Sequence, residues 1–209
     1  PTSSILMILV GLTGGIASGK SLTANILRGL GAYLLDADEI SHELIKSESP
    51  VWRDIVDRFG TDILREDKEI DRPSLARIIF SDQEKRLELN AILHPRIFTE
   101  EERRRKEIAG RDPSAIVVFV APLLIECSAH ELVDKVILVY ADRNTQIKRL
   151  MERDRLSREE AIRRIESQMP LSKKREFADY IIDGRRPINE IEEEVRKIYA
   201  ELKEMTVSV

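Results

Sequence analysis

The sequence predicts an α/β fold in which helices cover both faces of a parallel sheet, and two observations carry that prediction. Short apolar segments rich in β-branched residues recur along the chain of 209 residues, and helical patterns separate them. Segments such as AIVVFVA are apolar without alternation, which is typical of strands buried on both faces. We therefore expect strands at 8–12, 32–35, 115–120, 135–140 and 180–182.

The composition bounds the class of protein. The net charge is −4, so the chain offers no basic field for nucleic acid or an anionic membrane. The apolar run 5–12 is far too short to span a bilayer, and the single cysteine, Cys127, fits a reducing cytosol as an inert thiol. We expect a cytoplasmic protein that is a monomer or a weak homo-oligomer, with Met7 as its natural start and no function in residues 1–6.

The helical regions follow from capping and periodicity. Ser81 with Glu84, and Ser157 with Glu160, have the spacing of a capping box, which predicts two helix starts. His94 precedes Pro95, which biases it away from helical angles and predicts the end of the helix EKRLELNAIL. The last helix has one apolar stripe, expected to pack in the core, formed by Ile191, Val195, Ile198, Tyr199 and Leu202.

The stretch between the second and third expected strands is unusually long. It shows helical patterns but no buried-strand signal, and it contains far more chain than a crossover connection needs. We therefore expect one domain over residues 1–209 that contains an inserted helical subdomain at about 43–112.

The string GGIASGKS follows the first expected strand. Gly14, Gly19, Lys20 and Ser21 have the phosphate-loop spacing, and the string opens a helix with apolar residues on one face. Glycines allow successive N–H groups to form a concave nest, and the helix adds the positive end of its dipole. Lys20 would reach the β and γ phosphates, and the Ser21 hydroxyl would ligate magnesium. The sequence therefore predicts a nucleoside triphosphate site.

Other phosphate-loop classes fit less well. DRFG, which begins at Asp57, has the letters of a GTPase switch but follows a helical pattern, and no guanine-reading motif is present. The strand IVVFVAP does not end in the aspartate that a transporter-type ATPase uses for magnesium. These observations favour a small-molecule kinase.

Asp36 and Asp38 directly follow the second expected strand. In an extended chain they point to the same side, at the rim where parallel sheets bind ligands. One would accept or orient the proton of an attacking hydroxyl, and the other would help to place magnesium or its waters. The rival interpretation is that Asp38 merely caps the next helix, from about Glu39.

The motifs together resemble the dephospho-CoA kinase family. The resemblance covers nearly all of the chain from Met7, in the strings GLTGGIASGKS, DADEISHEL, IDRPSLARIIF, ILHPRI, APLLIE, RLMERDRLSREEA and SQMP with ADYIID. It implies ATP-dependent phosphorylation of the ribose 3′-hydroxyl of dephospho-CoA, the last step of coenzyme A synthesis. It also implies a fold like that of nucleoside monophosphate kinases: a five-stranded parallel sheet flanked by helices, a helical CoA-binding subdomain and a helical lid, here at about 146–176.

The resemblance and the chemistry together assign the catalytic roles to Lys20, Asp38 and Arg149. Arginines of the lid would stabilise the transferring phosphate, and we expect Arg149 first and Arg153 second in this role. The alternative is that these arginines only face solvent, as charged side chains on helices usually do. The expected ATP site is Gly14, Gly15, Ile16, Ala17, Ser18, Gly19, Lys20, Ser21, Leu22, Arg149 and Arg153, with Mg²⁺ on Ser21.

The expected acceptor site is Asp36, Asp38, His42, Arg72, His94, Leu123 and Glu126. His42 lies four residues past Asp38, which places both on one helix face, but a surface histidine is an equal reading. Arg72 would bind a substrate phosphate or form a surface ion pair. His94 would be a helix stop or line the CoA pocket.

Two residues depart from the family pattern. Ala17 stands where glycine is usual, and Gly184 stands where asparagine is usual, which bears on the adenine contacts. Two other functions stay open: another small-molecule or nucleotide kinase of the same fold, and a non-catalytic ATP-binding regulator.

Overall fold

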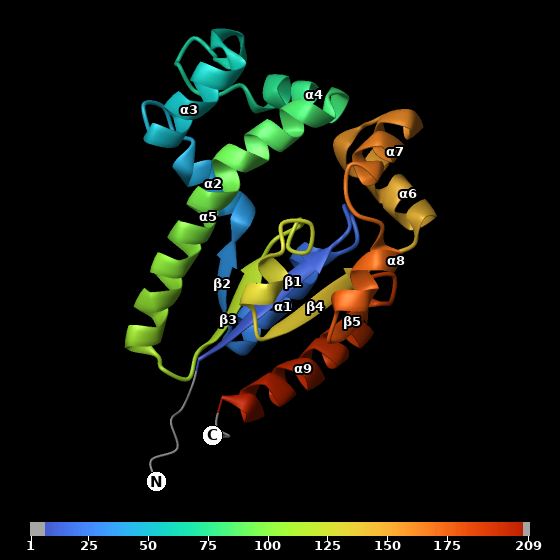
Figure 1. Ribbon diagram of the computed structural model, residues 1–209. Helices are drawn as coiled ribbons and strands as arrows, with labels where there is room; N and C mark the ends of the chain where they lie inside the picture. The colour runs from blue at the N-terminus through green and yellow to red at the C-terminus, as the bar shows by residue number, and fades with distance from the viewer. Residues whose placement is uncertain (1–6, 207–209) are drawn as a thin grey trace. The chain divides into compact units, whose positions relative to one another are not determined.

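The computed structural model describes residues 7–206; residues 1–6, upstream of the expected start, and residues 207–209 lie outside this range. One sheet has the strand order β2-β3-β1-β4-β5 (Figure 1). Strand β1 pairs in parallel with β3 and β4, and β4 pairs in parallel with β5. The prediction of five strands is confirmed, with bounds β1 (Ile8–Gly14), β2 (Tyr33–Asp36), β3 (Ile116–Val120), β4 (Lys135–Tyr140) and β5 (Tyr180–Asp183).

One face of the sheet packs against α1 (Lys20–Leu30) and α9 (Ile188–Met205). Alternate residues of the strands, such as Val10 and Val118, join the helices in a single apolar core. The stripe on the last helix packs there as predicted: Ile191, Val195, Ile198 and Leu202 are buried and Tyr199 is partly buried. Figure 1 shows α9 running along the sheet.

The segment after β3 lies against the opposite face. A side chain on Gly11 would overlap Leu124, so glycine allows this segment to approach β1 closely. The Thr13 hydroxyl donates to the Pro122 carbonyl oxygen at 3.2 Å. Segment 122–126 is therefore fixed beside the carboxyl end of β1, where the phosphate loop begins.

The chain forms two compact units, one of residues 36–104 and one of the remaining residues. The 36–104 unit is helical, with an isolated antiparallel bridge between Leu64 and Ile70. Its own core consists of Ile45, Val51, Ile55, Ile63, Ile70, Leu75 and Leu89. In the part of the chain that the structure describes, the other helices are α2 (Ala37–Leu44), α3 (Pro50–Phe59), η1 (Thr61–Ile63), α4 (Arg72–Ser81), α5 (Gln83–Arg111), η2 (Ala129–Leu132), α6 (Arg143–Asp154), α7 (Arg158–Glu166), α8 (Leu171–Lys174) and η3 (Arg175–Phe177).

Two predictions about helix ends were wrong. Helix α5 continues through His94 and Pro95 to Arg111, because its buried residues Leu89 and Ile97 hold both sides of the proline. The capping box at Ser81 does not form: the Ser81 hydroxyl donates to carbonyls at the end of α4, and the Asp82 carboxylate accepts the first N–H groups of the α5 turn.

The predicted capping box of α7 is confirmed. The Ser157 hydroxyl accepts the Glu160 N–H, and the Glu160 carboxylate accepts the Ser157 N–H. Within residues 7–206, each helix is too short or too polar to cross a bilayer.

Candidate active site

The phosphate loop turns between β1 and α1. A Cβ atom on Gly14 would lie 2.6 Å from the Ser18 Oγ and 2.7 Å from the Val139 carbonyl oxygen, so no larger residue fits. The Ser18 N–H donates to the Gly15 carbonyl at 3.1 Å, which closes the turn. Gly19 has a φ of 104°, in the left-handed region that favours glycine. Helix α1 begins at Lys20, so the string opens a helix as predicted.

The loop leaves a set of backbone donors open. Within residues 7–206, the N–H groups of Ala17, Gly19, Lys20 and Ser21 donate to no protein acceptor outside the sheet and helix ladders. Helix α1 has no acidic residue in its first turn, so the positive end of its dipole is not neutralised there. Open N–H groups beside a helix N-terminus and a lysine form a site for a polyphosphate.

Two glutamines hold the loop from distant parts of the chain. The Gln146 side chain on α6 donates to the Ile16 carbonyl at 2.8 Å, and the Gln168 side chain accepts the Ile16 N–H at 3.2 Å. A side chain on Gly15 would overlap Gln146 Nε2, so the glycine is needed for this contact. Sequence reasoning missed both glutamines, since no local pattern marks a contact across 130 residues or more.

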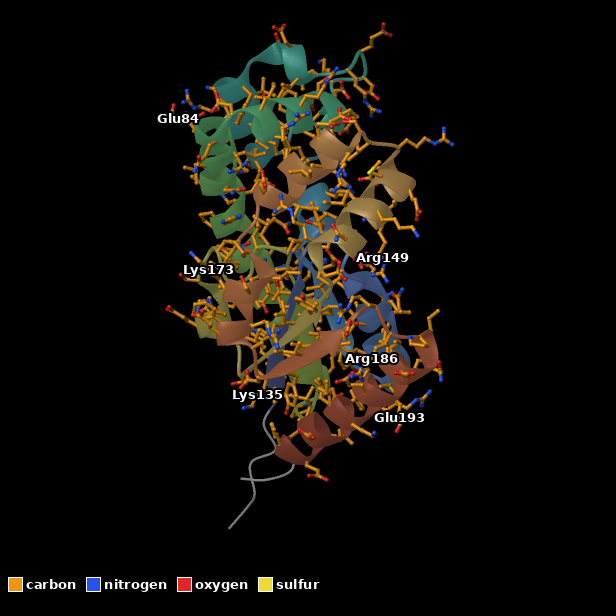
Figure 2. All side chains as sticks on the ribbon, turned by 90° about the vertical axis from the view of Figure 1, so that its right-hand side faces the viewer. Glu84, Lys135, Arg149, Lys173, Arg186 and Glu193 are labelled. Carbon is orange, nitrogen blue, oxygen red and sulfur yellow. The ribbon has the colours of Figure 1, made fainter. Side chains whose placement is uncertain are left out.

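Arg149, labelled on α6 in Figure 2, also contacts the loop. Its guanidinium donates to the Gly184 carbonyl at 2.8 Å, and longer contacts reach the Ala17 and Ser18 carbonyls at 3.4 and 3.5 Å. Arg153 instead pairs with the Asp154 carboxylate at 2.6 Å, with a side chain that is 61% exposed. The structure therefore brings Arg149, but not Arg153, to the carbonyl side of the loop.

The two departures from the family pattern have structural consequences. Ala17 adopts a φ of 57°, which costs an L-residue energy that glycine would not incur. Gly184 lies against the Ser18 carbonyl, and any Cβ atom there would overlap it. An asparagine at position 184 would therefore require a different loop backbone, whereas glycine is compatible with the backbone seen here.

Segment 122–126 carries two of the predicted acceptor residues. Glu126 accepts the Met169 N–H at 3.0 Å and lies 2.9 Å from the Lys174 ammonium. The Leu123 carbonyl accepts the Cys127 thiol at 2.8 Å, and burial raises the pKa of that thiol, as befits an inert cysteine. Lys174 is fully buried, and sequence reasoning missed it because its partners lie far away in the chain.

The aspartate pair has a different local geometry from the predicted one. Strand β2 ends at Asp36, and Asp38 lies in the first turn of α2, so the alternation expected of an extended chain does not apply. Asp36 is the helix cap: its carboxylate accepts the N–H groups of Asp38 and Glu39 at 2.8 and 3.3 Å. The rival interpretation, that Asp38 caps the helix, was wrong, because Asp36 is the cap.

The remaining predicted acceptor residues all lie in the 36–104 unit. His42 is exposed on α2, and Arg72 is exposed at the start of α4, where it lines a pocket of about 300 Å³ with Arg65 and Asp71. His94 is partly buried within α5, and burial lowers its pKa, so the neutral ring is favoured. Its ring centroid lies 6.2 Å from that of Phe98.

A metal would depend on the nucleotide for most of its ligands. Among residues 7–206, no group of three or more histidine, cysteine, aspartate or glutamate side chains could hold an ion. The Ser21 hydroxyl is exposed in the first turn of α1, beside the open N–H groups. This donor set fits Mg²⁺, which is commonly bound through one or two protein ligands and substrate phosphates.

Comparison with known proteins agrees with this loop and sheet. A family profile described as dephospho-CoA kinase matches residues 8–190. Relatives named dephospho-CoA kinase are 43% identical in Syntrophus aciditrophicus, over 94% of this chain and 83% of the relative, and 45% identical in Geobacter metallireducens, over 93% and 96%. The structure of a dephospho-CoA kinase from Campylobacter jejuni has a TM-score of 0.61 and 28% identity, covering 94% of this chain and 97% of that one. The chain belongs to the dephospho-CoA kinase family.

Proposed function

We propose that this chain transfers the γ phosphate of ATP to the ribose 3′-hydroxyl of dephospho-CoA and releases CoA and ADP, the last step of coenzyme A synthesis. The observation that carries the proposal is the set of open N–H groups of Ala17, Gly19, Lys20 and Ser21 at the start of α1, in a chain of this family. We further propose that the reaction takes place in the cytoplasm and that the protein is a monomer or a weak homo-oligomer.

The nucleotide binds along Gly14 to Leu22. Lys20 contacts the β and γ phosphates as a mobile point charge. The Arg149 guanidinium holds the loop by its hydrogen bonds to the loop carbonyls. Arg153 lies on the same helix and would reach the phosphates only after its ion pair with Asp154 breaks. Members of a kinase family use ATP, typically with a divalent metal; Mg²⁺ on Ser21 and the phosphates would neutralise the charge that develops during transfer.

The acceptor binds to the helical 36–104 unit. Asp38 aligns the 3′-hydroxyl and takes its proton, while Asp36 fixes the turn that carries Asp38 by capping it. Arg72, beside the pocket near Arg65, supplies a planar donor set for a substrate phosphate. His42, His94, Leu123 and Glu126 complete the proposed acceptor contacts.

The reaction is a direct in-line transfer without a covalent enzyme intermediate. Holding both reactants in attack geometry supplies most of the rate, because the protein forms no bond to the phosphorus. Helices α6 to α8, at about 146–176, serve as the lid, and its closure keeps water from competing with the hydroxyl.

Substitution of Asp38 tests the assignment of roles. Asp38→Asn removes the proton acceptor but keeps the size and the helix turn, so we expect turnover to fall about 10²-fold or more with ATP affinity unchanged. Lys20→Ala is expected to weaken both ATP binding and turnover. Glu39→Gln, in the same exposed turn, is the matched control and keeps activity. Steady-state kinetics and calorimetric ATP titration measure these effects.

Normal turnover in Asp38→Asn would remove Asp38 from the chemistry. ATP binding without transfer to any acceptor in the unmodified protein would instead support a regulator.

A further inference from the structure

Lys174 is a buried charge that the proposed mechanism does not use. It ends α8, its side chain is 0% exposed, and its Nζ donates to the Pro122 carbonyl oxygen at 2.7 Å and lies 2.9 Å from Glu126 Oε1. Removing an ammonium from water is costly, and a well-packed apolar residue is often at least as stable in such a place. Stability alone therefore does not account for a lysine here.

The partners of Lys174 join three segments of the chain. The Pro122 carbonyl also accepts the Thr13 hydroxyl, one residue before the phosphate loop. The Glu126 carboxylate also accepts the Met169 N–H at 3.0 Å. The ammonium thus ties the end of β1, segment 122–126 and segment 168–174 to one another.

Segment 168–174 itself contacts the phosphate loop. Gln168 accepts the Ile16 N–H at 3.2 Å. A Cβ atom on Gly15 would lie 3.0 Å from Leu171 Cδ1, so this leucine packs closely on the loop. Movement of Lys174 would therefore be transmitted both to the loop and to segment 122–126.

Burial and Glu126 act on Lys174 in opposite directions. Burial lowers the pKa of the Lys174 ammonium, and the Glu126 carboxylate, 2.9 Å away, opposes that effect. The charges of Lys20 and Cys127 act on the pKa of Lys174 more weakly, Lys20 lowering it and Cys127 raising it. The protonated form of Lys174 is therefore supported mainly by Glu126.

We propose that Lys174 is a positioning residue for phosphate transfer, which holds segment 122–126 against the phosphate loop. This inference rests on the proposed kinase function.

Kinetics test the tie. Lys174→Met keeps the apolar stem and removes the charge, and we expect kcat with dephospho-CoA to fall about 10- to 100-fold, since small misplacement at a reacting centre is that costly. KM for ATP should change less than about threefold, because the loop donors remain. Lys173→Met is the matched control: Lys173 is exposed, as Figure 2 shows at the edge of the molecule, and its loss leaves kcat unchanged. A folded Lys174→Met with unmodified kcat would overturn the proposal.

Glu126→Gln provides a second test of the proposal if Lys174→Met does not fold. It removes the carboxylate that supports the protonated lysine, so the alkaline limb of the kcat profile moves to lower pH. An unshifted limb counts against the proposal. If the unmodified protein transfers no phosphate to dephospho-CoA but does transfer it to another acceptor, the acceptor assignment fails, and the same kcat comparison between Lys174→Met and Lys173→Met with that acceptor tests the role of Lys174.

Discussion

Single residues decide how the phosphate loop is held. The glycine spacing with Lys20 and Ser21 could be predicted because it reflects local backbone needs: Gly14 has no room for a side chain and Gly19 has a φ of 104°. The supports from Gln146, Gln168 and Lys174 could not be predicted, because each contact joins residues more than fifty positions apart. A polar residue in a helix carries no sequence signal of its distant partner.

Ala17 offers a test at this scale. Its φ of 57° is unfavourable for alanine, so Ala17→Gly is expected to raise the free energy of unfolding by about 0.5–1 kcal/mol. Ala200→Gly, at an exposed position of α9, is the control and should lower it by about 1 kcal/mol. Urea denaturation measures both, and a loss of stability in Ala17→Gly would show that the loop backbone differs from the one described.

The apolar pattern of the sequence predicts the strands closely, but it predicts the ends of helices less well. All five strands lie within two residues of their predicted ends. The central strands β1, β3 and β4 are buried and carry a continuous apolar signal, and the shorter edge strands β2 and β5 carry an apolar signal although they are only partly buried. Helix α5 shows why ends are harder to predict. A proline favours a helix end, but Leu89 on one side and Ile97 on the other are buried, and this packing outweighs the lost hydrogen bond.

Helix α5 should consequently be strained at Pro95. Pro95→Ala restores a backbone donor inside the helix and removes the ring, so we expect the free energy of unfolding to rise by about 1–3 kcal/mol. Pro50→Ala is the matched control, because Pro50 lies at the start of α3, where the missing donor costs little. Thermal and urea unfolding measure the difference; equal effects at the two prolines would contradict this account of α5.

The whole molecule consists of two compact units, residues 36–104 and the rest. The sequence predicted an insertion at about 43–112 from the missing strand signal. The unit begins earlier because α2 follows β2 directly, and it ends within α5, a continuous helix whose apolar pattern shows no break there. The reaction itself cannot be read from either unit, since the loop shows only that a polyphosphate fits. The acceptor is assigned through the family.

A two-substrate assay tests the central claim most directly. ADP release is followed with ATP and Mg²⁺, with and without dephospho-CoA, and the product is analysed by mass spectrometry and by the position of the new phosphate. We predict ADP formation that depends on dephospho-CoA and a product that carries one added phosphoryl group on the ribose 3′ oxygen. ADP formation that is indifferent to dephospho-CoA, or a large preference for another acceptor, would contradict the account.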